Sequence, residues 1–66
     1  MEITVNGQTQ SVPEGFTAAQ LIEQMGLGER RIAMEVNLEI VPRSTYPEYA
    51  LNPGDRIEIV HAVGGG

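Results

Sequence analysis

Three consecutive glycines, Gly64, Gly65 and Gly66, follow Val63 at the end of the sequence, and the carboxylate of Gly66 is the group best suited to chemistry. Glycine has no Cβ and accepts almost any backbone angle, so a glycine tail can enter a channel too narrow for other residues. Its carboxylate is then available for activation by a partner enzyme. Chain ends are commonly disordered, so a frayed end without function is the alternative interpretation.

The rest of the sequence offers no catalytic or metal-binding constellation. There is one histidine, His61, no cysteine and no serine in a strand-to-helix elbow, so no nucleophile, base and orienting group can be assembled. His61 also lacks a second ligand at metal-binding spacing, and we interpret it as a structural residue rather than a docking or proton-transfer group. The sequence predicts a protein that is not an enzyme and binds no cofactor or metal.

Size and charge limit the class of partner. The 66 residues suffice for one small domain, and a net charge of −5 disfavours nucleic acid and anionic membranes as ligands. Partner proteins with a basic docking face fit this charge, although solubility alone also accounts for it. No apolar run reaches membrane-spanning length, no signal peptide is recognisable, and the absence of cysteine fits a reducing compartment. We expect a cytoplasmic protein that is monomeric when free.

All four basic residues are arginine, and lysine is absent. A lysine amine would attack an activated terminal acyl group, whereas a guanidinium stays protonated and inert. A carrier without lysine therefore cannot acylate its own side chains. Compositional bias is the alternative explanation.

The first twelve residues predict a β-hairpin. Asn6-Gly7 is the strongest two-residue hairpin signal, and it separates the alternating segment 3–5 from the polar segment 8–12.

A single helix follows the hairpin. Thr17 and Gln20 have the spacing of a capping box, and Gly26 followed by Leu27 is typical of a Schellman ending. The apolar residues between them recur at helical spacing and form one stripe, which consists of Ala18, Leu21, Ile22 and Met25. A short helix with one apolar stripe must lie on a sheet, and we expect Met25 in the core.

The second half of the chain predicts three strands and two irregular connections. The expected strands are 32–36, 39–41 and 56–63, and the connections are 43–51, read as irregular backbone or one loose helical turn, and the turn 52–55. Tyr46 and Tyr49 could either form part of a docking surface or cover the edge of the core.

This order of elements predicts an α+β architecture of the β-grasp type, with about five strands in one mixed sheet and one helix across one face. The first and last strands are expected to be parallel neighbours at the centre of the sheet. We assign residues 1–63 to the β-grasp domain and residues 64–66 to a flexible glycine tail, which reaches about 10 Å when extended.

Three segments, 37–43, 51–60 and 61–66, resemble the family of small sulfur carrier proteins of thiamine biosynthesis, within the ubiquitin-like β-grasp superfamily. The resemblance covers essentially the whole chain. A terminal Gly-Gly alone is shared by several β-grasp proteins, whereas the Ile-Val-Pro-Arg sequence of 40–43 and the small size point to this branch.

The resemblance implies a co-substrate that is consumed and regenerated. An E1-like adenylating enzyme would use ATP to adenylate the carboxylate of Gly66, and a persulfide-bearing sulfur donor would convert the adenylate to a thiocarboxylate. The thiocarboxylate would then give its sulfur to a thiazole synthase. Gly65 and Gly66 carry over directly from the family motif, and Gly64 extends it.

By analogy with the family, the residues that contact partners are Val63, Gly64 and Gly65 in the tail, and Ile59 and Val60 with the sheet face around them. Ile59 and Val60 could instead be core residues. Three other functions remain open: a molybdopterin-type sulfur carrier, a ubiquitin-like protein modifier, and a β-grasp binding module without tail chemistry. Deletion of Gly65 and Gly66 should abolish the function of either carrier but leave the function of a binding module intact.

Overall fold

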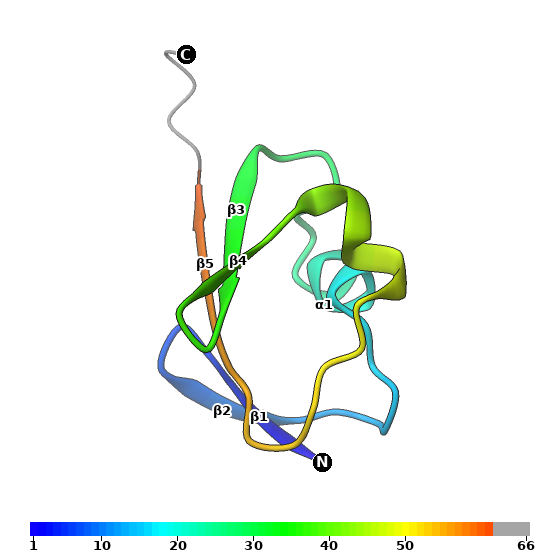
Figure 1. Cartoon of the computed structure of the whole chain (residues 1–66), viewed down its shortest axis with the longest axis vertical. Helices are drawn as coiled ribbons and strands as arrows, with labels where there is room; N and C mark the ends of the chain where they lie inside the picture. The colour runs from blue at the N-terminus through cyan, green and yellow to red at the C-terminus, as the bar shows by residue number, and fades with distance from the viewer. Residues whose placement is uncertain (62–66) are drawn as a thin grey trace.

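The computed structural model describes residues 1–61, which form one mixed sheet with a helical layer on one side (Figure 1). Within these residues the sheet has five strands in the order β2-β1-β5-β3-β4. The elements are β1 (Glu2–Val5), β2 (Gln8–Ser11), α1 (Ala18–Gln24), β3 (Ile32–Val36), β4 (Glu39–Val41), the 3₁₀ helix η1 (Arg43–Glu48) and β5 (Arg56–His61). The predicted β-grasp architecture is confirmed.

Strand β5 lies at the centre of the sheet although it is the last strand in the described sequence. It runs parallel to β1, with Thr4 opposite Arg56 and Val5 opposite Ile57. On its other side β5 pairs antiparallel with β3 along five residues. The predicted parallel pairing of the first and last strands is therefore confirmed.

The β1–β2 hairpin has the turn that its sequence predicts. Asn6 and Gly7 both have positive φ angles, 50° and 84°, as a two-residue type I′ turn requires. The buried side chains Ile3 and Val5 alternate along β1, whereas β2 is exposed along most of its length. The hairpin thus places one apolar row on the core and a polar strand at the edge.

Helix α1 has the two predicted ends. Thr17 Oγ1 accepts a hydrogen bond from the backbone N of Gln20 at 3.1 Å, and the Gln20 side chain accepts from the backbone N of Thr17 at 2.9 Å. At the other end, the backbone N of Leu27 donates to the carbonyl of Ile22 at 3.0 Å while Gly26 has a φ of 73°. The capping box and the Schellman ending are both confirmed.

The expected core position of Met25 is wrong. Ala18, Leu21 and Ile22 are buried, but Met25 is 37% exposed. The helix ends at Gln24, so Met25 is the C-cap residue and lies beyond the part of the stripe that faces the sheet.

The core lies between the sheet and the helical layer. It includes Tyr46 from η1, which is 4% exposed, so this tyrosine covers the core and is not part of a docking surface. The buried apolar residues are Ile3, Val5, Val12, Ala18, Leu21, Ile22, Ile32, Met34, Val36, Val41, Tyr46, Leu51, Ile57 and Ile59.

A buried carboxylate joins two turns at the start of β5. Asp55 is 7% exposed, and its side chain accepts hydrogen bonds from Asn37 Nδ2 at 3.0 Å and from the backbone N of Asn52 at 2.8 Å. Asn37 Oδ1 accepts from the backbone N of Arg56 at 3.0 Å. These bonds fix the β3–β4 turn against the turn that precedes β5.

Glycine substitutions at the two residues of the β3–β4 turn should change the free energy of unfolding in opposite directions. Asn37→Gly should lower the free energy of unfolding by about 1–3 kcal/mol, because Asp55 stays buried but loses a donor. Leu38→Gly should raise it by about 0.5–1 kcal/mol, since Leu38 has a φ of 72°, which disfavours a side chain. Urea unfolding of both variants checks the prediction. Shifts in the same direction would contradict it.

Tyr46 should make stability depend on alkaline pH. Burial raises the pKa of Tyr46 above 10.0, against the smaller opposing effects of Arg43 and of a hydrogen bond with the backbone of Met34. The folded state therefore holds the phenolic proton more tightly than the unfolded state does. The resulting stability is complete below about pH 10 and is lost as the pH rises through the folded-state pKa. Urea midpoints between about pH 8 and 11 should fall less steeply in Tyr46→Phe, and an unchanged slope would count against this assignment.

Candidate functional site

The described part of the predicted site is the end of β5, where Ile59, Val60 and His61 are the last residues placed. The other predicted site residues, Val63, Gly64, Gly65 and Gly66, lie outside the described residues. Strand β5 is therefore the described part of the chain that precedes these residues.

Ile59 and Val60 lie on opposite faces of β5. Ile59 is 8% exposed and packs in the core, so the core interpretation holds for this residue. Val60 is 58% exposed on the other face, which carries no helix. Side chains alternate along a strand, so only one of two consecutive residues can face a partner. Contact with a partner stays a prediction for Val60.

Asn6 holds the end of β5 on the side of β1. Strand β1 pairs with β5 only as far as Ile57, but the backbone N of Asn6 donates to the carbonyl of Ile57 at 2.9 Å. Asn6 Oδ1 then accepts from the backbone N of Ile59 at 2.8 Å. One asparagine thus makes the bonds that a longer β1 would make. The local sequence marks Asn6 as a turn residue only and carries no signal of this second role.

On the other side, β3 supports β5 to its end, because Ile32 lies opposite His61. His61 is the last residue of β5, which confirms its predicted place in the last strand. Its side chain is exposed. In residues 1–61 no group of three or more His, Cys, Asp or Glu side chains could hold a metal ion.

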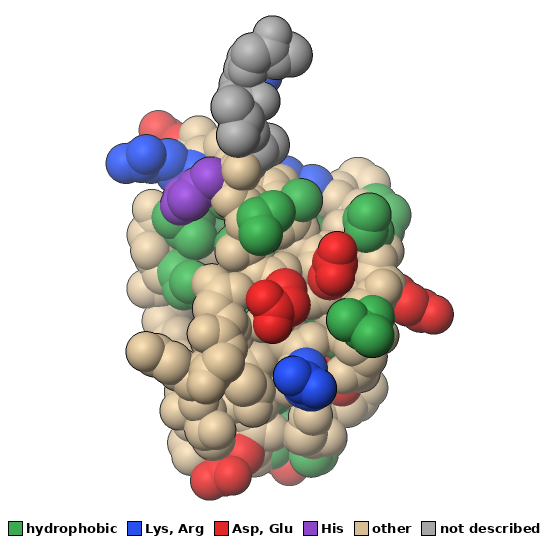
Figure 2. Space-filling model, turned by 90° about the vertical axis from the view of Figure 1, so that its left-hand side faces the viewer, with side chains coloured by type: hydrophobic (Ala, Val, Ile, Leu, Met, Phe, Trp, Pro, Cys, Tyr) green, Lys and Arg blue, Asp and Glu red, His purple; other side chains and the backbone are tan. Residues whose placement is uncertain are grey.

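The sheet face opposite α1 is not covered by any described element (Figure 1). A hollow of about 230 Å³ on it is lined by five residues of β3, β4 and β5, which we call the open sheet face: Ala33, Glu35, Ile40, Glu58 and Val60. Ile40 is 72% exposed. Figure 2 shows hydrophobic side chains on this side of the molecule around two central acidic groups. Ile40 was not predicted as a site residue, because the two adjacent apolar residues Ile40 and Val41 do not show from sequence alone which of them is exposed.

These features define a class of protein: a ubiquitin-like β-grasp domain with an uncovered sheet face, in which the last described strand lies at the centre of the sheet. The chain belongs to the ThiS family, which it matches over residues 1–66. The predicted membership in the sulfur carrier family of thiamine biosynthesis is confirmed.

Two relatives match along their whole length. The sulfur carrier protein ThiS of Escherichia coli is 30% identical over 66 residues, which are 100% of both chains. The crystal structure of the thiamine biosynthesis protein ThiS from Geobacter metallireducens has a TM-score of 0.85 at 26% identity and covers 100% of both chains. The fold and the family assignment therefore agree.

Other relatives are much longer than this chain. A thiazole synthase from Paramagnetospirillum magneticum is 41% identical over all 66 residues, and a thiazole synthase from Magnetococcus marinus is 36% identical. The chain spans about one fifth of the length of each, 20% in both cases. A segment similar to this chain thus occurs within proteins named for thiazole synthesis. In the described part of the chain, no helix is long and apolar enough to cross a membrane.

Proposed function

We propose that this chain is a cytoplasmic sulfur carrier for thiazole formation in thiamine biosynthesis, with the carboxylate of Gly66 as the sulfur-bearing group. The observation that carries the proposal is the match to the E. coli sulfur carrier protein ThiS along 100% of both chains. The proposal requires a free carboxylate on Gly66. It is favoured over the molybdopterin-type carrier and the protein modifier because the similar protein from Geobacter metallireducens is named for thiamine biosynthesis and two other relatives are named thiazole synthase.

The chemistry needs activation because a carboxylate is anionic and resists nucleophilic attack. An oxygen of the Gly66 carboxylate attacks the α-phosphate of ATP, which releases pyrophosphate and forms an acyl-adenylate. The terminal sulfur of a persulfide then attacks the acyl carbon, and AMP leaves with the bonding electron pair. A thiol must cleave the resulting acyl disulfide to free the thiocarboxylate.

Partner proteins supply all the groups that this chain lacks. The sequence contains no cysteine, so the persulfide and the resolving thiol belong to partners. ATP binds to an E1-like adenylating enzyme, and the carrier itself binds no cofactor. The thiocarboxylate then donates sulfur to a thiazole synthase, a partner that is supported by the similarity to the two proteins of that name.

The surfaces divide between docking and delivery. Val60 and the open sheet face are the proposed contacts for a partner, and Val63, Gly64 and Gly65 are the proposed contacts within its channel. Strand β5 supports this division, because it connects the sheet face directly with the tail and is held on both sides up to Ile59.

Intact-protein mass spectrometry tests the function. The chain is incubated with ATP, a persulfide donor and the adenylating enzyme of the same cell. The expected result is a mass increase equal to the replacement of one oxygen by one sulfur, which disappears when ATP is omitted. Absence of both adenylate and thiocarboxylate with an active enzyme would reject the proposal and favour a binding module.

A further inference from the structure

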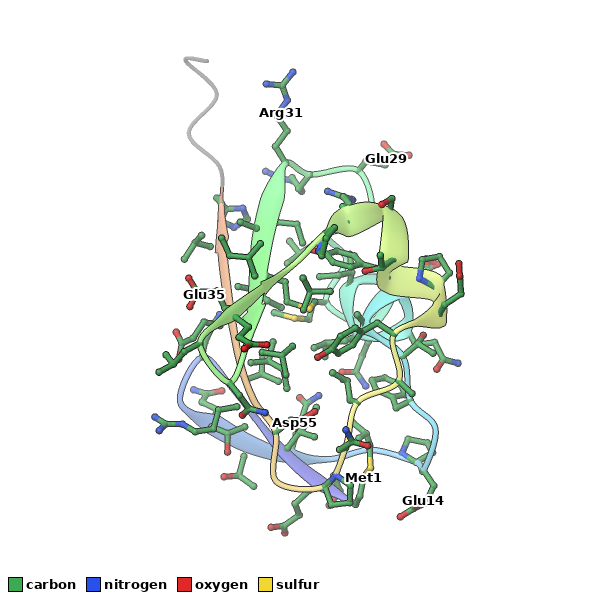
Figure 3. The ribbon with its side chains drawn as sticks, viewed as in Figure 1. Met1, Glu14, Glu29, Arg31, Glu35 and Asp55 are labelled. Carbon is green, nitrogen blue, oxygen red and sulfur yellow. The ribbon has the colours of Figure 1, made fainter. Side chains whose placement is uncertain are left out.

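Two glutamates lie directly opposite each other at the centre of the open sheet face. Glu35 on β3 pairs with Glu58 on β5 in the antiparallel register. Opposite residues have Cβ atoms about 4.5–5.5 Å apart, and like charges in this position destabilise a sheet. Figure 3 shows Glu35 projecting to the side away from α1. Glu35 is also partly buried, so water screens its charge less than that of a fully exposed group.

The chain does not neutralise this pair within its described part. Arg56 shares the face with Glu58, since it lies two positions earlier on β5, and the two residues line a second hollow of about 70 Å³. Among residues 1–61, however, no ion pair joins Glu35 or Glu58 to a cation. Within the described residues the pair is thus two like charges in opposite positions, an arrangement that is unfavourable in a sheet.

A second feature of the same surface also costs stability. Leu38 is 87% exposed at a φ of 72°, a backbone conformation that side chains rarely adopt. It lines the smaller hollow together with Glu58, which lines both hollows. Core packing does not account for an exposed leucine at a positive φ beside an acidic pair, and outliers of this kind are typical of functional surfaces.

We propose that this surface docks a thiazole synthase by accepting one basic side chain of the enzyme between Glu35 and Glu58, with apolar enzyme groups against Leu38, Ile40 and Val60. This inference rests on the proposed sulfur-carrier function. An arginine suits the position best, because its planar guanidinium carries five donors and can bind two carboxylates at once. Binding would remove the repulsion, so the acidic pair favours the complex over the free protein.

The choice of partner follows from charge and from the relatives. A face with an acidic centre and an apolar border complements a basic residue that projects from an apolar patch. Segments similar to this chain occur within two proteins named thiazole synthase, which supports that enzyme over other basic proteins. Val60 lies next to His61 at the end of β5 and only six residues before Gly66 in the sequence, so docking on this face would leave Gly66 within reach of a short segment.

The double variant Glu35→Gln/Glu58→Gln tests the proposal, because stability and binding should move in opposite directions. The urea midpoint should rise, since the repulsion is removed. The Kd for purified thiazole synthase of the same organism, measured by isothermal titration calorimetry, should increase about tenfold or more. A residue with only a structural role would not produce this opposition.

A matched control removes the same charge elsewhere. Glu14→Gln/Glu23→Gln removes the same number of charges, from two exposed glutamates away from the open sheet face, one in the turn before α1 and one on α1. Figure 3 shows Glu14 on the other side of the molecule from Glu35. The Kd of Glu14→Gln/Glu23→Gln for thiazole synthase should stay within about twofold of the wild-type value, because only screened long-range effects remain.

Leu38→Gly should raise the urea midpoint and weaken binding to thiazole synthase several-fold.

The outcomes separate this inference from the proposed function. Unchanged affinity in Glu35→Gln/Glu58→Gln, or a fall of its urea midpoint together with its affinity, overturns the docking proposal. A wild-type chain that forms a thiocarboxylate but does not bind thiazole synthase also overturns it and leaves the carrier function intact. A chain that binds as described but is never thiocarboxylated supports the docking face and rejects the carrier function.

Discussion

Deletion of Gly65 and Gly66 should abolish thiocarboxylate formation, with no mass increase after incubation with ATP, the persulfide donor and the adenylating enzyme. The deletion shortens an extended tail by about 7 Å, so a carboxylate on Gly64 cannot reach the position where Gly66 would react. Chemistry at a reacting centre tolerates only far smaller displacements, since a misplacement of about 1 Å can lower the rate a hundredfold.

The shortened chain should fold normally, because the core residues lie between Ile3 and Ile59. An unchanged urea midpoint is the control that excludes unfolding as the cause. Gly65→Val is a second test variant. It keeps the length of the tail but adds a branched side chain, and it should also lose most of the thiocarboxylate formation. Full activity of the deletion variant would mean that the protein works as a binding module.

Ile57→Ala should leave the protein largely unfolded. Ile57 is fully buried in the central strand, between Val5 of β1 and Val36 of β3. Truncation of a buried isoleucine costs about 2–5 kcal/mol, whereas a single core in a domain of this size supplies only about 3–5 kcal/mol. Circular dichroism and urea unfolding at 25 °C would measure the loss.

Val60→Ala is the matched control on the same strand. Val60 is 58% exposed, and substitutions at exposed positions usually change stability by no more than about 0.5 kcal/mol. A fully folded Ile57→Ala protein, or a loss of stability at Val60 as large as that at Ile57, would contradict the described alternation along β5.

Features set by local sequence were predictable. The Asn6-Gly7 turn, the Thr17 capping box and the Gly26 helix end each depend on residues within a few positions of one another, and the structure has all three. The parallel pairing of β1 and β5 followed from the order of the elements and from the apolar character of the last strand.

Features set by packing were not predictable. Periodicity placed Met25 on the apolar stripe, but the helix ended one residue too early to bury it. The sequence did not decide whether Tyr46 covers the core or lies on a docking surface, because a 3₁₀ turn has no clear apolar period. The bond from Ile59 to Asn6 spans 53 positions, and no local pattern reports such a contact.

The candidate site divides in the same way. The tail was recognisable because three glycines are an unusual local pattern. The docking residues needed the register of the sheet: alternation alone does not say whether Ile59 or Val60 is buried, and only the pairing of β3 with β5 places Glu35 opposite Glu58.

The central position of β5 has a consequence for synthesis of the protein. Strands β1 and β3 are made first, but they are joined in one sheet only when β5 (Arg56–His61) pairs with both of them. A nascent chain that stops before β5 lacks Ile57 and Ile59 and cannot close its core. Folding therefore waits for long-range contacts that form late, which slows it relative to a helical domain of equal size. Because β5 is needed to close the core, only chains that have been translated through β5 can fold and bind a partner.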